Sequence, residues 1–277
     1  MTTAAIPAIP ARTRAVPAAT RRPGLPETIR SEFTKIISVR STYWTLLAFV
    51  AASIGWAGLD CAGIVSHGID GGFNATEASL TGQVALGELI IVVLGALVIT
   101  SEYSTGMIRT SLAVMPRRST LYAAKAIVFA AVTLTISLIT SFVDFFVGQA
   151  ILSSKHYNAT LGQPGVLRSI FLSAAIVMVF GLLAYGAGAI IRHTAGAITA
   201  ILGVVFLIPL LAQALPNAWF ADLQRWLPGG GALEPIARST PPISPHLFSA
   251  WGEFAVFSGY AAVLLALGAW LFIRRDA

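Results

Sequence analysis

Charged residues are scarce in this chain. Asp, Glu, Lys and Arg together make up 11% of its 277 residues, whereas 56% are hydrophobic and the mean hydropathy is +0.78. A soluble globular domain has about 25% charged residues, so the composition excludes that class. Long apolar runs, at roughly 20 residues for each crossing, predict an all-α integral membrane protein with six transmembrane helices.

Cysteine and the common catalytic motifs are also scarce. Cys61 is the only cysteine, which excludes an intrachain disulfide, a zinc cluster and an iron–sulfur site. The four histidines lie far apart in loops, so no metal site is expected. HExxH and GxSxG do not occur, and neither does GxxxxGK[ST], the loop that cradles nucleotide phosphates. We therefore expect no enzyme activity and no cofactor in this chain.

The apolar runs and the positive charges predict a topology. The spans are expected at 43–59, 82–100, 121–152, 169–191, 195–215 and 254–273. Only four of the 18 Lys and Arg residues then fall in outer loops, namely Lys155, Arg168, Arg225 and Arg238. The other fourteen fall inside, which places both termini in the cytoplasm. Because most cations sit at span ends and in the N-terminal tail, the net charge of +6 does not indicate a nucleic-acid partner.

Several segments have a distinctive composition. Residues 1–25 are rich in Ala, Pro and Arg and are predicted to be disordered. Pro209 predicts a kink in the fifth span, and the aromatic, Pro-rich stretch 216–252 predicts an outer hairpin that dips partly into the bilayer. The fourth span carries small residues that let helices approach closely. They are Gly181, Ala184, Gly186 and Gly188.

An amphipathic helix is predicted before the first span. It begins at Pro26, and its apolar stripe consists of Ile29, Phe33, Ile36 and Ile37. The stripe is too short to cross a bilayer, so we expect an interface helix that lies along the cytoplasmic membrane surface. A soluble helical turn leading into the first span is the alternative. The charged residues are assigned to the other faces of the helix: Glu27, Arg30, Glu32, Lys35 and Arg40.

The segment Ser101–Lys125, between the second and third spans, combines charge with helical periodicity. Apolar and small polar residues (Met107, Thr110, Ser111 and Val114) recur at helical spacing, Gly106 precedes them, and Pro116 ends the run. An ordered cytoplasmic helix at this place offers a soluble partner a point of contact with the membrane domain. The alternative is a basic turn that only obeys the positive-inside rule. Its charged residues are Glu102, Arg109, Arg117, Arg118 and Lys125.

Two acidic residues fall within the spans. Glu88 lies about 9 Å below the outer face of the second span, at 1.5 Å per residue. A carboxyl at that depth is a functional candidate, and it is also the kind of group that makes a structural hydrogen bond to a neighbouring helix. Asp144 lies late in the third span, where we expect ordinary solvation near the outer interface.

The motif in SEYSTGMIRTSLAVMPRRSTLYAAK resembles that of ABC exporter permeases of the ABC-2 type. Glu102, Gly106, the Pro116–Arg117 pair and Lys125 match the family's residues after the second span. The amphipathic stretch before the first span and the aromatic outer segment before the last one are similar too. The resemblance covers the chain from Pro26 onward, so 26–277 is expected to form a single transmembrane permease domain.

The resemblance also implies partners and roles. Two permease chains, expected as a homodimer, would pair with two copies of a separate ATPase subunit that binds ATP and Mg²⁺, in a bacterial-type plasma membrane. Substrate would pass between the permease chains, with Glu88 as a possible lining residue of the path. The coupling helix would contact the ATPase, and the residues implied in coupling are Glu102, Gly106, Arg109, Pro116 and Arg117.

Two other functions remain open from the residues alone. A secondary transporter driven by an ion gradient is favoured by Glu88, because such proteins carry ionisable groups inside the membrane. A non-transporting membrane scaffold would have the same hydropathy. The sequence motif around Glu102 favours the ATP-driven exporter over both.

Overall fold

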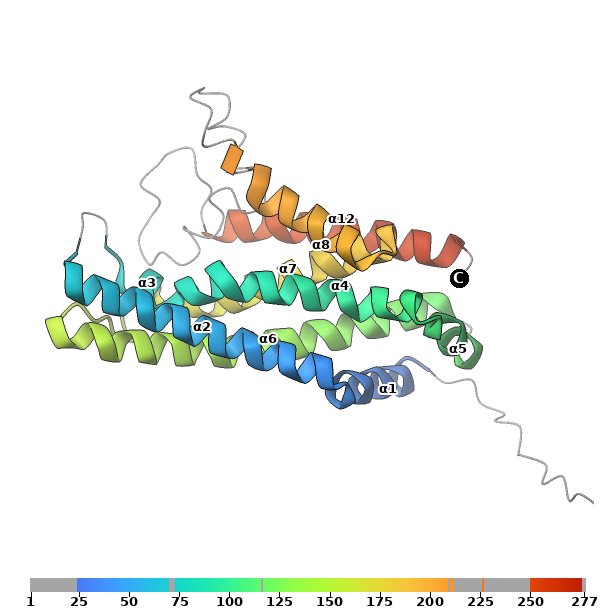
Figure 1. Ribbon diagram of the computed structural model, residues 1–277, viewed down its shortest axis with the longest axis horizontal. Coiled ribbons are helices and arrows are strands. Elements are labelled where there is room, and N and C mark those ends of the chain that lie inside the picture. Colours follow the sequence, from blue (N-terminus) through green and yellow to red (C-terminus); the bar gives the residue numbers. More distant parts are fainter. Residues whose placement is uncertain are drawn as a thin grey trace, which may run out of the picture.

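The computed structural model describes residues 24–69, 73–115, 117–208, 210–211, 226 and 250–275, and every regular element within these ranges is helical. The helices form an elongated bundle whose long members run nearly parallel (Figure 1). Their order is α1 (Leu25–Ser38), α2 (Arg40–His67), α3 (Ala75–Gly82), the π-helix η1 (Gln83–Gly87), α4 (Glu88–Ser104), α5 (Met107–Val114), α6 (Arg118–Leu152), the 3-10 turn η2 (Ser153–Lys155), α7 (Val166–Ile191), α8 (Thr194–Leu202), the π-helix η3 (Gly203–Leu207) and α12 (Ala250–Arg274).

The two ends of the bundle carry different elements. Figure 1 shows α1, α5 and the C-terminal end of α12 at one end, which we call the α5 end, and α3 at the opposite end, the α3 end. The chain runs from the α5 end to the α3 end in α2, returns through α3, η1 and α4, and repeats this path in α6 and α7.

Five helical stretches are long and apolar enough to cross a membrane, which agrees with five of the six predicted spans. They are Arg40–His67, Ala75–Ser104, Arg118–Lys155, Val166–Ile191 and Phe254–Arg274. The predicted fifth span corresponds to the shorter apolar helix Thr194–Leu207, and its last predicted residues, 212–215, lie outside the described residues. Pro209, the tail 1–23 and nearly all of 216–249 lie outside them as well.

The structure corrects the predicted loop between the first two spans. The first span was expected to end at residue 59, but α2 continues to His67 because Ile64 and Val65 pack against a cluster that includes Cys61 and Leu152. Part of the expected loop is helical too. Asn74 begins α3 by accepting hydrogen bonds from the backbone N–H groups of the next turn, at 3.0 and 3.3 Å.

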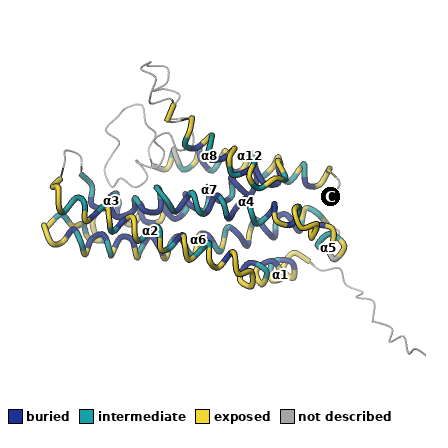
Figure 2. The backbone as a smooth tube through the Cα atoms, viewed as in Figure 1, coloured by how far each residue is buried: buried dark blue, intermediate teal, exposed yellow. Residues whose placement is uncertain are grey.

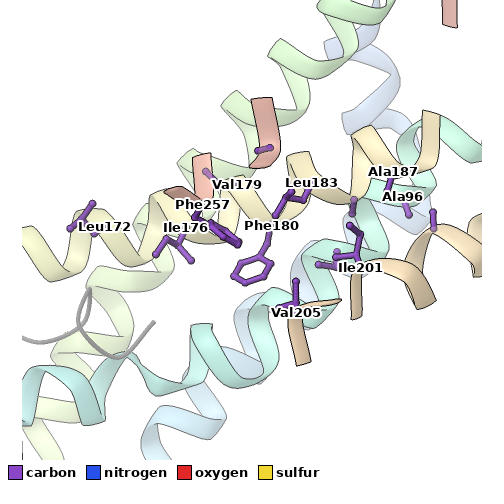
Figure 3. Packing of buried hydrophobic residues seen from close by; sticks show 14 residues of the cluster. Ala96, Leu172, Ile176, Val179, Phe180, Leu183, Ala187, Ile201, Val205 and Phe257 are labelled. Carbon is purple, nitrogen blue, oxygen red and sulfur yellow. The ribbon is translucent and has the colours of Figure 1, made fainter. Parts of the chain in front are cut away.

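Helix α7 is the axis of the bundle and packs against α4, α6, α8 and α12. Buried positions follow α7 and α4 through the interior, whereas α2 exposes much of its outer face (Figure 2). The largest apolar cluster joins α7 to α4, α8 and α12, and within it Phe180 and Phe257 lie side by side, with ring centroids 4.4 Å apart (Figure 3). The small residues predicted in the fourth span make this packing possible, because a Cβ atom on Gly95 of α4 would overlap the Gly181 carbonyl of α7.

We expect Gly95→Ala to destabilise the protein by about 1–3 kcal/mol, because the added methyl group forces α4 and α7 apart. The midpoint of thermal unfolding in detergent measures the effect. Gly55→Ala in α2 is the matched control, since nothing lies within 4 Å of the Cβ position there. Equal stability of the two variants would contradict the close approach of α4 and α7.

Candidate functional site

Helix α1 lies against the bundle at the α5 end, but with a different face from the predicted one. Thr28, Glu32 and Ile36, spaced one turn apart, are its buried residues. Within the predicted apolar stripe, Ile29 packs with Ile36 against the core, whereas Phe33 and Ile37 are 47% and 60% exposed. The assignment of Glu32 to an outer face is therefore wrong, because Lys125 of α6 supplies a positive charge that draws it inward.

Four charged side chains from three helices form a cluster beneath α1. In α1, Lys35 Nζ donates to Glu32 at 3.0 Å and reaches Glu102 of α4 at 2.8 Å. Lys125 of α6 donates to Glu32 and to Glu102, each at 2.6 Å. Two carboxylates and two ammonium groups alternate around this ring, so its net charge is zero. We call these four residues the ion cluster.

The ion cluster is largely removed from water. Glu32, Glu102 and Lys125 are each less than 5% exposed, and only Lys35 reaches the surface. Burial acts to lower the pKa of Lys35, but its hydrogen bonds and charge interactions with Glu102 and Glu32 outweigh this effect and raise the pKa above its ordinary value of 10.5. Lys35 therefore stays protonated at neutral pH and balances the second carboxylate.

Helix α5 follows α4 after a sharp turn at Gly106. This residue has φ of +70°, a left-handed conformation that glycine adopts without strain and other residues rarely take. Ile108 anchors α5 in an apolar cluster with α4, α6, α7 and α12. Met107 and Arg109 remain exposed, so α5 presents a surface that combines an apolar and a basic side chain.

Helices α1 and α5 enclose a groove of about 310 Å³. Glu27 and Ser31 line it from α1, and Met107 and Ser111 line it from α5. At its base the Thr28 hydroxyl contacts the sulfur of Met115, the residue that follows α5, at 3.6 Å. This contact joins α1 directly to the segment after α5.

The residues after α5 connect to the C-terminal helix. Arg118, the first residue of α6, donates to the backbone carbonyl of Arg275 at 2.6 Å, and Arg275 donates to the carbonyl of Ile190 at the end of α7. Arg117 is exposed at the start of α6. Pro116, the remaining predicted coupling residue, lies outside the described residues.

The two carboxyls within the spans are both fully buried. Neither oxygen of Glu88 has a hydrogen-bond partner among the described residues, so the predicted bond to a neighbouring helix is absent there. The expectation that solvent surrounds Asp144 is wrong. It shares a face of α6 with Ser141 and Gly148, and this face is covered by Gln83 of η1, Ser79 of α3 and Cys61 of α2.

The sequence brought Glu102 and Lys125 into one motif but did not predict their partners. The missed residues are Glu32 and Lys35, which were assigned to the polar side of an amphipathic helix. One signal was available, because Lys125 lies inside the predicted third span and an ammonium group there requires an anionic partner. Among the described residues, no group of three or more His, Cys, Asp or Glu side chains is arranged to hold a metal ion.

We expect Lys125→Met to destabilise the protein by about 3–5 kcal/mol, since it leaves a buried carboxylate without its counter-charge. Adding Glu102→Gln to this variant should recover part of the loss, because the unpaired charge is then removed. Thermal unfolding measures both variants, with Lys155→Met at the exposed turn η2 as the control. Strictly additive losses in the double variant would show that the two residues are not coupled.

Comparison with known families identifies a family to which the chain is similar. The model of the family described as ABC-2 family transporter protein matches residues 28–210, which include most of α1, all of α5 and all four residues of the ion cluster. A search of curated proteins found no match.

Proposed function

Because this chain belongs to the ABC-2 transporter family, we propose that it is the permease subunit of an ATP-driven exporter whose ATP hydrolysis takes place in a separate subunit. The membrane-spanning bundle and the missing GxxxxGK[ST] motif support the assignment of transport to this chain and of ATP hydrolysis to another subunit. ATP and Mg²⁺ would then bind to two copies of the partner ATPase. The bundle lies in a bacterial-type plasma membrane with both termini in the cytoplasm, so the α5 end is the cytoplasmic end.

The observation that carries this proposal is the ion cluster beside α5. Helix α5 is attached to α4 through Gly106 and to α6 through the residues around Met115. Glu102 and Lys125, on the two flanking helices, are bonded to each other and to α1. Force applied by an ATPase to Met107 and Arg109 is therefore transmitted to α1, α4 and α6 together, rather than bending α5 alone.

This geometry refines the role of Glu102. Its side chain is buried and bonded to two lysines, so it acts in coupling through the ion cluster rather than by touching the ATPase. Gly106 permits the turn that presents α5, while Arg109 and Arg117 supply exposed positive charge. The exposed edge of α1, Phe33 and Ile37, is suited to rest on the membrane surface.

A second permease chain is expected to cover an exposed apolar face. Val204, Leu207 and Ile208, in and just after η3, are each at least 40% exposed, and η3 continues α8, which packs against α4. A homodimer formed across this face would place the second and fifth spans of each chain around a shared path for substrate. Glu88 faces the interior of its own protomer, which argues against its direct exposure to such a path.

Co-purification tests whether a separate ATPase subunit binds this chain. A tag after Ala277, mild solubilisation of native membranes and identification of the bound proteins should yield a stoichiometric partner that carries GxxxxGK[ST]. ATP hydrolysis by this complex confirms the assignment. A homo-oligomer with no nucleotide-binding partner, found in several detergents, overturns it.

We expect the double variant Met107→Asp/Arg109→Glu to bind the partner ATPase at least about tenfold more weakly, a loss of about 1.4 kcal/mol. The variant replaces an exposed apolar side chain of α5 with a carboxylate and an exposed positive charge with a negative one. Both side chains are exposed, so the midpoint of thermal unfolding should change little. Lys155→Glu, beyond the opposite end of α6, is the matched charge-reversal control. Wild-type affinity in the double variant would exclude α5 as the contact.

A further inference from the structure

A layer of polar side chains crosses the interior of the bundle. It adjoins an apolar layer in which Phe49, Ile91, Phe129 and Val177 belong to one buried cluster. One turn closer to the α3 end, each of the four helices carries a polar residue that is at most 1% exposed. These four residues, which we call the polar layer, are Ser53 of α2, Glu88 of α4, Thr133 of α6 and Ser173 of α7.

Close contacts fix the relative heights of these helices. A Cβ atom on Gly181 of α7 would lie 2.7 Å from Phe129 and 2.9 Å from Ile91, so α4, α6 and α7 meet at the apolar layer. One on Gly87, next to Glu88, would lie 2.7 Å from Phe49 and 2.8 Å from the Ser53 hydroxyl. The Ser53 hydroxyl therefore lies beside the residue before Glu88, while the Ser53 backbone carbonyl packs against Gly82, more than one turn closer to the α3 end. The parallel helices α4 and α7 meet at Gly95 and Gly181, and both Glu88 and Ser173 lie about two turns from that contact.

The polar layer continues into a hydrogen-bonded group toward the α3 end. The side-chain amide of Gln83, in η1, donates to the Ser137 carbonyl at 2.8 Å and its oxygen accepts from the Ser141 hydroxyl at 3.0 Å. The π-helix η1 spans the residues from Gln83 to Gly87 and so ends directly before Glu88. Short π-helical segments occur frequently at functional sites.

Unlike the Gln83 amide and the Thr133 hydroxyl, which donates to the Phe129 carbonyl at 2.8 Å, several oxygens in and next to the layer lack partners. Both carboxyl oxygens of Glu88 and the hydroxyls of Ser53, Ser137 and Ser173 have no hydrogen-bond partner in the described part of the chain. Buried polar groups in proteins are nearly always satisfied, and ordered water often supplies the missing bonds. These unpaired oxygens lie on four neighbouring helices, with Ser137 one turn closer to the α3 end than Thr133, and they indicate a bound species between the helices.

No basic side chain of the described residues balances Glu88. The buried face of α2 offers Cys61, the face of α6 offers Asp144, and Arg168 stands at the far end of α7 with an interaction of its own. Lys125 and Glu102 already belong to the ion cluster, and the buried positions of α8 are apolar. An unpaired carboxylate inside a membrane protein is costly, whereas a neutral carboxyl is much less so.

We propose that the polar layer is a proton-binding site, in which Glu88 holds the proton and bound water links its carboxyl group to Ser53, Ser137 and Ser173. The site goes beyond the proposed coupling function and does not depend on it. The carboxylate takes its proton from water and returns it to water, so no other reactant is required. Loss of the proton demands hydration of the layer, which ties the protonation state of Glu88 to the opening of the four-helix packing.

Infrared spectroscopy of the full chain in lipid tests this site directly. At neutral pH, the spectrum of the wild type minus that of Glu88→Gln should contain a carbonyl band of a protonated carboxylic acid, equal to one group per chain. Glu88→Asp should shift this band rather than remove it. Asp144→Asn, the matched control, should leave it in place, because Asp144 lies nearer the α3 end of α6.

Changes of the buffer cation and of pH distinguish a proton site from a sodium site and from an ionised carboxylate. The band should persist when choline in the buffer is replaced by Na⁺, whereas its loss would overturn the proton assignment in favour of a sodium site. Absence of any Glu88-dependent band would show an ionised carboxylate and also overturn it. From mildly acidic to mildly alkaline pH, the midpoint of thermal unfolding should fall more in the wild type than in Glu88→Gln, since only the wild type then acquires a buried charge.

Discussion

The ion cluster is the interaction on which the α5 end of this protein depends. Each of its charges is acceptable in a buried place only because the others are present: Lys125 needs both carboxylates, and the second carboxylate needs Lys35. Such an arrangement does not add stability over an apolar core of the same volume. It enforces geometry, because α1, α4 and α6 cannot separate without exposing unpaired charge. Helix α5, whose two ends are joined to α4 and α6, is thereby mounted on a rigid support.

Packing around α7 explains how this support is held within the bundle. Of the most apolar 18 residues of each helix, 67% are buried in α7, compared with 22% in α2 and 22% in α12. The interior contacts of α7 rely on glycine, since the backbones of α4 and α7 approach too closely for a side chain between Gly95 and Gly181. The poorly covered outer faces are left to lipid or to another chain.

Much of this architecture could be predicted from the sequence, and the exceptions have a common cause. Hydropathy located five long spans. The ordered helix after Gly106 was predicted from that glycine and from the helical spacing of the residues that follow it. Periodicity, however, states which residues share a face and not which face will be covered. Glu32 was therefore placed outside, although α6 offers it Lys125. Asp144 was assigned to solvent, although α2 and α3 cover its face of α6.

The two polar regions share α4 and α6 and differ in how their side chains are bonded. In the ion cluster every side chain is bonded, so α1, α4 and α6 move together. The polar layer is poorly bonded, and the apolar layer of Phe49, Ile91, Phe129 and Val177 lies between the two. An apolar layer packed at the density of a protein interior transmits displacement instead of absorbing it. Beyond the apolar layer the π-helix η1 gives way to α4 directly beside Glu88, so the irregular part of this span lies at the polar layer and not at the ion cluster.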